Sequence, residues 1–315
     1  MTDLAFGVFY SLEHPESREL ILKKGFDFFV QAAEIAEKLN FEVVCHPDHF
    51  MLYKNNTFFD AWTLLTALAP KTKTIRLASL VTPVPFYQPA FLAKRLASLD
   101  VISGGRVVFG AGCGWYEKEF RGYGVPYDSF SVRIRKMLEG IELMKSLWTR
   151  DGPIDFAGKY YRLHGAELEP KPLQKPHPPI WFGGTSRQIL EAVAVHGQGW
   201  MPWEISPETY KTKLALLHEL LRKENRDPSE VTTGVAFRTV VSSESREVKR
   251  LMELESLKRE FIHPVVGDKR TLVCGTPDEC RSQLQDYVEA GAKQFIFGIK
   301  PISKLREGIE LLSTI

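Results

Sequence analysis

Eight short apolar runs, separated by stretches with helical periodicity, constrain the fold of this chain more than any other feature. Between the runs, apolar residues recur at positions i, i+4 and i+7, as in Phe28, Ala32 and Ile35. This alternation predicts βαβ units and a parallel sheet. The runs are rich in β-branched and aromatic residues, and they cover residues 4–10, 41–45, 75–81, 106–110, 180–182, 199–203, 234–241 and 294–298.

Eight strands over 315 residues favour a closed (β/α)8 barrel, or TIM barrel, that forms one domain over residues 1–315. An open doubly wound α/β sheet usually has fewer strands. It would also carry a G-x-G-x-x-G dinucleotide fingerprint after its first strand, and this chain has none there.

Residues 151–179 break this alternation, with six prolines and no convincing helical pattern. A loop of this length in a compact domain is more often functional than accidental. We therefore expect an insertion that lies over the C-terminal mouth of the barrel, and the alternative is a plain surface loop.

Composition excludes several classes of partner. The formal net charge is +2 with acids and bases interleaved, so neither nucleic acid nor an anionic membrane is expected as a partner. No apolar stretch reaches the roughly 20 residues that span a bilayer, and the first residues lack the pattern of a signal peptide. We expect a cytoplasmic protein. Its four cysteines are far apart and contain no C-x-x-C, which predicts reduced thiols.

Polar or glycine-rich corners follow four of the predicted strands, at residues 45–49, 79–83, 112–115 and 183–186. The site of a TIM barrel forms at the C-terminal ends of its strands, so these corners are expected to meet at one mouth. The last corner, Gly183, Gly184, Thr185 and Ser186, precedes a predicted helix and favours a bound phosphate. Taken alone, it is equally well explained as a glycine turn with an N-cap serine.

Asp48 and His49 are the candidate catalytic residues. An imidazole titrates near neutrality and a carboxylate can fix its tautomer, which favours a hydrogen-bonding or proton-transferring pair. A pair that only stabilises the loop is the alternative. His46 and His49 form a His-x-x-His pattern, but no distant third ligand is evident, so no metal is predicted. The nearby acids Glu117 and Glu119 are expected to be solvated loop charges.

Several motifs in order carry a family resemblance. They are "PDHF" (residues 47–50), "SLVTP" (79–83), "GAGCGWYEKEFRGYG" (110–124), "PKP…PHPPIWFGG" (170–184) and "GTPDE" (275–279). In this order and spacing, over nearly the whole chain, the set resembles the bacterial-luciferase-like superfamily of flavin and deazaflavin oxidoreductases. The resemblance implies a barrel with an insertion over its mouth and a flavin-like ring at the strand ends.

Site residues follow from this resemblance. Asp48 and His49 would face the ring, and Ser79-Leu80 would form a bulge behind it, often with a non-prolyl cis peptide in relatives. Thr82 would hydrogen-bond the ring edge. The remaining predicted cofactor-binding residues would hold the ribityl phosphate, and they are Gly112, Cys113, Gly183, Gly184, Thr185 and Ser186.

One position differs from the family that this chain resembles. Its sugar-phosphate dehydrogenase branch carries a glutamate where this chain has Trp115, so neither that acid nor that substrate is transferred. Aromatic residues near the mouth could instead line an apolar pocket, although such residues also pack barrels routinely. They are Phe50, Tyr53, Trp115, Tyr116, Trp181 and Trp203.

Three functions remain open from the sequence. The first is hydride transfer between the 8-hydroxy-5-deazaflavin coenzyme F-420 (also written F420) and a small organic substrate, because "SLVTP" and "PDHF" look most like that branch. The second is an FMNH2-dependent monooxygenase that uses O2. The third is a non-catalytic flavin-binding barrel. Relatives commonly dimerise, so a homodimer is expected.

Overall fold

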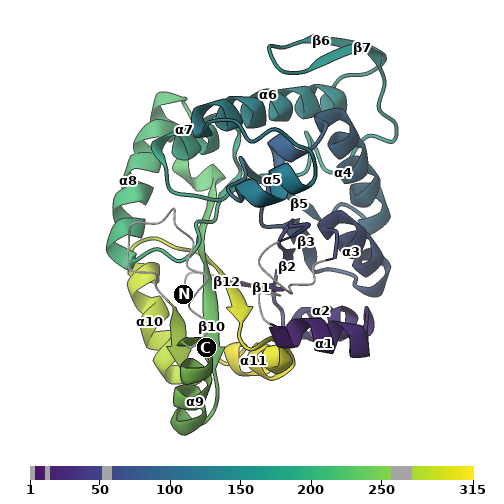
Figure 1. The fold of residues 1–315 in the computed structure, drawn as a ribbon. Coiled ribbons are helices and arrows are strands. Elements are labelled where there is room, and N and C mark those ends of the chain that lie inside the picture. Colours follow the sequence, from purple (N-terminus) through teal and green to yellow (C-terminus); the bar gives the residue numbers. More distant parts are fainter. Residues whose placement is uncertain (1–3, 11–14, 52–58, 257–271) are drawn as a thin grey trace.

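A closed ring of parallel strands forms the centre of the molecule (Figure 1). The computed structural model describes residues 4–10, 15–51, 59–256 and 272–315. In these residues each strand pairs with the next around the ring, and the last pairs with the first, which confirms the predicted eight-stranded TIM barrel. In ring order the strands are β1 (Ala5–Phe9), β2 (Val43–His46), β3 (Arg76–Ser79), β5 (Val107–Gly112), β8 (Ile180–Phe182), β9 (Gly199–Trp200), β10 (Thr232–Val241) and β12 (Gln294–Ile299).

Two further strands extend this ring at its carboxyl end. β4 (Thr82–Pro83) continues the path of β3 after a short bulge and pairs with β5. β11 (Val273–Gly275) pairs with the last residues of β10, outside the closed ring.

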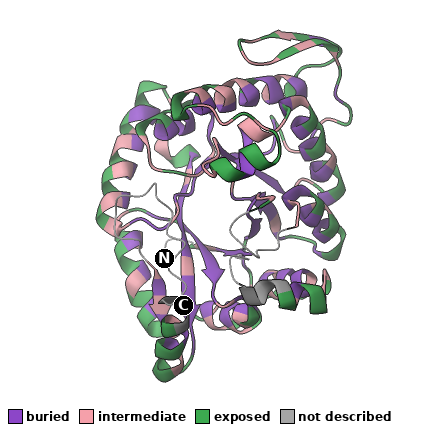
Figure 2. Cartoon of the chain, in the orientation of Figure 1, coloured by how far each residue is buried: buried purple, intermediate pink, exposed green. Residues whose placement is uncertain are grey.

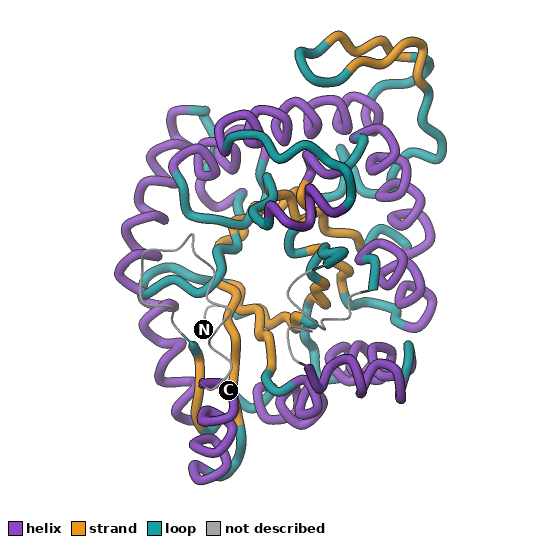
Figure 3. The backbone as a smooth tube through the Cα atoms, in the orientation of Figure 1, coloured by secondary structure: helices purple, strands orange, loops and turns teal. Residues whose placement is uncertain are grey.

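Helices surround the ring and cover its outer face (Figures 1 and 3). They are α1 (Pro15–Lys24), α2 (Asp27–Lys38), α3 (Ala61–Leu68), α4 (Pro89–Ser103), α5 (Glu117–Gly122), α6 (Phe130–Thr149), α7 (Arg187–His196), α8 (Pro207–Lys223), α9 (Ser245–Ser256), α10 (Pro277–Glu289) and α11 (Leu305–Leu312), with short 3-10 turns η1 (Ala69–Lys71), η2 (Val84–Phe86), η3 (Pro228–Glu230) and η5 (Ile302–Lys304).

Local signals set several helix starts. Thr276 caps α10, and Glu279 completes the predicted capping box. Ser206 caps α8 in front of a proline at the first helical position. The buried side of each outer helix faces the strands (Figure 2), and together these faces form the main apolar core.

The interior of the barrel holds a second apolar cluster. It contains Trp181, which is buried, and Trp203 packs against it. Trp181 therefore packs the interior of the barrel. In the sequence analysis this was the alternative to lining an apolar pocket. The other members are Phe9, Val43, Cys45, Ala78, Leu80, Val108, Met201, Ala236 and Ile296.

Residues 151–179 do not lie where the sequence analysis placed them. They contain an antiparallel hairpin, β6 (Ile154–Ala157) and β7 (Arg162–Ala166), which lies outside α6 (Figure 1). Glu139 of α6 accepts hydrogen bonds from the backbone at Tyr160 and Tyr161. Further along, Gln174 bonds to Asp100 near the end of α4.

These contacts correct the prediction of an insertion over the mouth. The prolines exclude a helix, but they do not determine which face of the barrel the segment follows. The hydrogen bond from Gln174 to the carbonyl of Val107, the first residue of β5, holds the segment near the amino end of the strands, away from the mouth. The segment after β5, which includes α5, lies at the carboxyl end of the strands instead (Figure 1).

Candidate cofactor site at the barrel mouth

The four predicted corners meet at neighbouring strand ends. His46 of β2 is in register with Ser79 of β3, and Thr82 of β4 is in register with Ala111 of β5. Ala111 is in turn in register with Phe182 of β8. The corners after these strands therefore lie side by side around half of the mouth.

The bulge between β3 and β4 explains the glycine-rich corner after β5. A Cβ at Gly110 would lie 1.9 Å from the Ser79 carbonyl oxygen, and one at Gly112 would lie 2.6 Å from a Val81 methyl carbon. Only glycine allows this approach. The corner thus makes room for residues 79–83, which we call the bulge.

The bulge contains a non-prolyl cis peptide, but at Leu80-Val81. The expected position, Ser79-Leu80, is one residue too early. The hydroxyl of Thr82 donates to that of Ser79 at 3.0 Å, and Ser79 donates to the Gly110 carbonyl at 3.1 Å. The hydroxyls of Ser79 and Thr82 are therefore fixed to β5 by a short chain of hydrogen bonds.

Asp48 is a buried carboxyl group beside this bulge. Its Oδ1 accepts a hydrogen bond from the Tyr87 hydroxyl at 2.8 Å. Burial raises the pKa of Asp48 to about 6, despite the opposing effect of that hydrogen bond. In the part of the chain that the structure describes, its buried Oδ2 has no hydrogen-bond partner. Asp48 can therefore change its protonation state near neutral pH.

His46 differs from its neighbour His49. It is fully buried, and its Nε2 lies 3.1 Å from the Phe59 carbonyl oxygen. Burial lowers the pKa of His46 to about 4, so its ring is neutral at physiological pH. Among residues 4–10, 15–51, 59–256 and 272–315, no group of three or more His, Cys, Asp or Glu residues is placed to hold a metal ion.

His49 lies at the mouth, with 16% of its side chain exposed, and its partner is Glu119 of α5. The His49 Nδ1 is 3.0 Å from the Glu119 Oε2, while the Glu119 Oε1 accepts from the backbone N–H groups of Phe50 and Met51. Glu119 is only 1% exposed, so the expectation of a solvated charge is wrong for it. Glu117, by contrast, is exposed and pairs with Arg121.

The Gly183 loop, residues 183–186, connects β8 to α7. Ser186 caps α7 by accepting from the backbone N–H of Ile189 at 3.3 Å, which confirms the N-cap alternative. Gly184 has φ +102°, a conformation that side chains disfavour, and its carbonyl accepts from the Trp200 indole at 2.9 Å. This geometry leaves the phosphate prediction open, because a capped helix start also offers N–H groups to an anion.

Aromatic rings surround the His49 side of the mouth. Trp115 meets His49 edge-on, with ring centroids 5.9 Å apart. Phe50 stacks on Phe86 at 5.1 Å. Tyr53 lies outside the described residues. Cys113 is partly buried, and burial raises the pKa of its thiol, so it is protonated at neutral pH.

A buried ion pair on the other side of the mouth was missed in the sequence. Glu204, 1% exposed, accepts from the guanidinium of Arg238 on β10, including Nη2 at 3.1 Å, and from the Arg238 backbone N–H at 3.2 Å. The two residues are 34 positions apart. No local motif links them.

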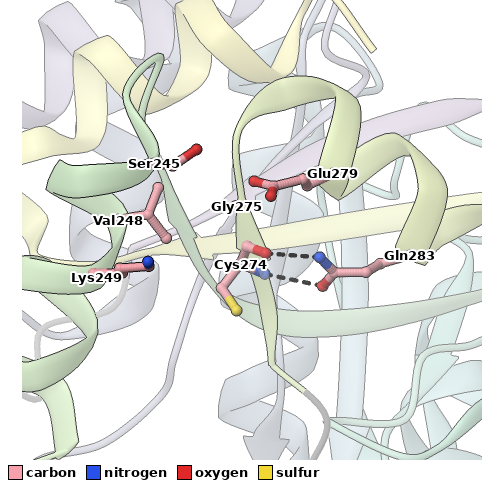
Figure 4. A pocket seen from close by; sticks show the side chains of 7 residues that line it. All are labelled: Ser245, Val248, Lys249, Cys274, Gly275, Glu279 and Gln283. Atoms are coloured by element: carbon pink, nitrogen blue, oxygen red, sulfur yellow. Dashed lines mark hydrogen bonds between the residues drawn. The ribbon is translucent and has the colours of Figure 1, made fainter.

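A separate cavity of about 200 Å³ lies between α9, β11 and α10 (Figure 4). The Gln283 side chain bonds to both backbone groups of Cys274 there, at 2.6 and 3.1 Å. Its lining shares no residue with the four corners. It is formed by Ser245, Val248, Lys249, Cys274, Gly275, Glu279 and Gln283.

Comparison with known proteins decides the family. The model of the luciferase-like monooxygenase family matches residues 4–294. The chain belongs to this family. Its barrel is thus that of a luciferase-like protein.

Two curated relatives of this luciferase-like protein differ in cofactor. The FMNH2-dependent dimethylsulfone monooxygenase of Pseudomonas putida is 36% identical over 162 residues, which span 51% of this chain and only 44% of that protein. The F420-dependent glucose-6-phosphate dehydrogenase of Amycolatopsis mediterranei (strain U-32) is 27% identical over 297 residues, 85% of this chain and 87% of that protein. The chain is therefore a luciferase-like oxidoreductase of the flavin or deazaflavin type.

Solved structures agree on the fold. An F420-dependent secondary alcohol dehydrogenase superposes with a TM-score of 0.81 at 23% identity, covering 99% of this chain and 98% of that one. A long-chain alkane monooxygenase gives 0.83 at 17% identity, covering 100% and 91%. The described helices include none that is long and apolar enough to cross a membrane.

Proposed function

We propose that this chain is an oxidoreductase that transfers a hydride between coenzyme F-420 and a small organic substrate. The observation that carries the proposal is the position of His49, at the mouth next to Asp48, with its Nδ1 held by Glu119. A histidine held in this way can act as a general acid or base.

The residues at the mouth fit a flavin-type cofactor. The glycines after β5 admit the bulge, which would support one face of the ring. Gly112, Cys113 and the Gly183 loop would hold the phosphate, because the start of α7 combines accessible N–H groups with a favourable helix dipole. When bound, the deazaflavin supplies the hydride chemistry at its central ring carbon.

Asp48 and His49 would manage the proton that accompanies the hydride. Oxidation of an alcohol releases a proton from its hydroxyl group, and reduction of a carbonyl takes one up. His49 would accept or donate that proton. Asp48, whose pKa is about 6, would change the charge next to His49 by gaining or losing a proton. Trp115 and Phe50 would shield this exchange from water.

The length of the alignment with the F420-dependent relative supports the deazaflavin over FMN as the cofactor. The F420-dependent relative aligns over 85% of this chain. Its named substrate, glucose 6-phosphate, is not carried over, because Trp115 stands where that branch has its glutamate.

An FMNH2-dependent monooxygenase is the second candidate. The observation in its favour is the higher identity, 36%, to the dimethylsulfone monooxygenase over half of the chain. The same bulge and Gly183 loop would serve FMN, since both cofactors carry a ribityl phosphate.

Titration with both cofactors tests the proposal. Fluorescence of coenzyme F-420 and of FMN would be followed as protein is added, and turnover would be screened with alcohols and carbonyl compounds. We expect saturable binding of coenzyme F-420 at micromolar concentrations, with reduction or oxidation of the coenzyme. Tight binding and turnover of FMNH2 without binding of coenzyme F-420 would reject it, and binding of neither would indicate a non-catalytic barrel.

A further inference from the structure

Glu119 is a buried residue whose side chain contacts the loop that carries His49, at three consecutive residues of the described chain. Its Oε1 accepts from the backbone N–H groups of Phe50 at 2.6 Å and Met51 at 2.9 Å. Its Oε2 lies 3.0 Å from the His49 Nδ1. Glu119 is 1% exposed, and it reaches this loop from α5 across 70 positions of sequence.

The two oxygens therefore have different tasks. One oxygen fixes the path of the backbone after His49, through two N–H donors. The other faces a ring nitrogen. An ionised carboxylate can only accept hydrogen bonds, so the nitrogen that faces it must carry a proton.

We propose that Glu119 is a positioning residue that holds neutral His49 in the Nδ1–H tautomer, so that Nε2 is the nitrogen that exchanges a proton with the substrate. This inference rests on the proposed function in assigning proton exchange to His49. The assignment of the tautomer rests on the contacts of Glu119 alone.

Other charged groups also face this ring and define what Glu119 adds. His46 is the last residue of β2 and Asp48 lies on the loop that follows it, and both are close enough to His49 to interact with its charge. Asp60 caps α3 and is coupled to both of them. The Glu119 carboxylate lies at hydrogen-bond distance from a ring nitrogen of His49.

Glu119→Gln separates the two tasks. The backbone donors of Phe50 and Met51 require an oxygen, so the amide oxygen of the glutamine must take the Oε1 position. Its NH2 group must then face the His49 Nδ1. Because that group is a donor, it requires an unprotonated Nδ1, and neutral His49 is forced into the Nε2–H tautomer. The backbone clamp is kept while the tautomer is reversed.

The matched control is Glu117→Gln. Glu117 lies on the same helix, is exposed and pairs with Arg121. This substitution makes the same chemical change two residues away without touching the His49 loop. It is expected to leave cofactor affinity, kcat and the His49 spectrum unchanged.

The experiment combines side-chain NMR of 15N-histidine-labelled protein with kinetics. His49 would be assigned among the eight histidines by the signal lost in His49→Asn. We expect the wild type to show a protonated Nδ1 and Glu119→Gln a protonated Nε2. In Glu119→Gln, kcat should fall by about a hundredfold or more, the effect of misplacing a general acid or base, while KM and the Kd of coenzyme F-420 change by less than about threefold.

Three results would overturn the inference. The first is a protonated Nε2 in the wild type, which does not depend on Glu119→Gln and so stands even if that variant does not fold. The second is a reversed tautomer with kcat retained. The third is a loss of coenzyme binding that matches the loss of kcat, since Glu119 would then only support the loop. If the wild type turns over neither cofactor, the proposed function fails, and the wild-type spectrum still decides the tautomer.

Discussion

The two sides of the candidate site are held by contacts of different range. Around His49, the polar contacts join residues that are far apart in sequence. His49 and Glu119 are 70 positions apart, and Asp48 and Tyr87 are 39 positions apart. Around the Gly183 loop, the contacts are closer in sequence: the Ile189 N–H donates to Ser186, three residues earlier, and the Trp200 indole donates to Gly184, 16 positions away. The first side depends on the closed barrel for its geometry, whereas the second is prepared by one strand-to-helix turn.

This difference assigns separate tasks to the two sides. A side that holds buried titratable groups suits proton exchange. A side that presents backbone N–H groups at a helix start suits an anion. Variants of each side should therefore affect different measured quantities, kcat on the His49 side and cofactor affinity on the Gly183 side.

Loss of the His49 ring is expected to have the largest effect. His49→Ala removes the proposed proton-exchanging group but leaves the Gly183 loop intact. We expect kcat to fall by about 10²- to 10⁴-fold, with cofactor affinity within about tenfold, or 1.4 kcal/mol. Steady-state kinetics and a fluorescence titration check this. Equal losses of kcat and affinity would show that His49 only supports the pocket.

The second largest effect is expected when the space that accommodates the bulge is filled. Gly110→Ala places a Cβ 1.9 Å from the Ser79 carbonyl oxygen, and a backbone atom cannot move away cheaply. We expect a loss of about 3 kcal/mol or more in the free energy of unfolding, measured by urea denaturation. The control is Gly183→Ala, whose nearest contact is a Val81 methyl at 3.2 Å and which should cost less. Equal stabilities would mean that the bulge adapts freely.

Phosphate binding by the Gly183 loop can be tested with two variants that differ in charge but not in size. Gly184→Asp and Gly184→Asn add side chains of the same size at the same φ of +102°, so backbone strain affects both. Only Asp repels a phosphate. Losing two charge-assisted hydrogen bonds of roughly 1.5–3 kcal/mol each should weaken cofactor binding about a hundredfold or more in Gly184→Asp, and distinctly less in Gly184→Asn. Equal affinities in two folded variants would place the phosphate elsewhere.

The smallest effect concerns the pH dependence of stability. The pKa of Asp48 is raised from 3.8 to about 6 in the folded protein, so the folded state binds this proton more tightly. The protonated Asp48 carboxyl group therefore adds to the free energy of unfolding at low pH, and this contribution is lost as the pH rises through about 6. Relative to Asp48→Asn, the wild type should lose about 1 kcal/mol between pH 5 and pH 7. Parallel curves for the two proteins would contradict the raised pKa.

Local and long-range contacts also separate what the sequence predicted from what it did not. The strands were predicted because each is a short apolar run, and the start of α10 because its capping box spans four consecutive residues. The burial of Glu119 was missed, since its partners are about 70 positions away. The hairpin of residues 154–166 was misplaced because prolines exclude a helix without choosing a face of the barrel.

The cis peptide shows the same limit on a finer scale. The resemblance placed the bulge and its cis bond at Ser79-Leu80, but the cis bond lies one residue later, at Leu80-Val81. The collision of a Cβ at Gly112 with Val81 is a contact between strands. It becomes visible only after the register of β4 with β5 is known.

A crystal structure with coenzyme F-420 bound would test the central claim most directly, because it locates both ends of the cofactor at once. The account predicts the phosphate within hydrogen-bond distance of backbone N–H groups in the Gly183 loop, and the ring between the bulge and His49. A phosphate bound at another strand end, or a ring that contacts neither the bulge nor His49, would contradict it.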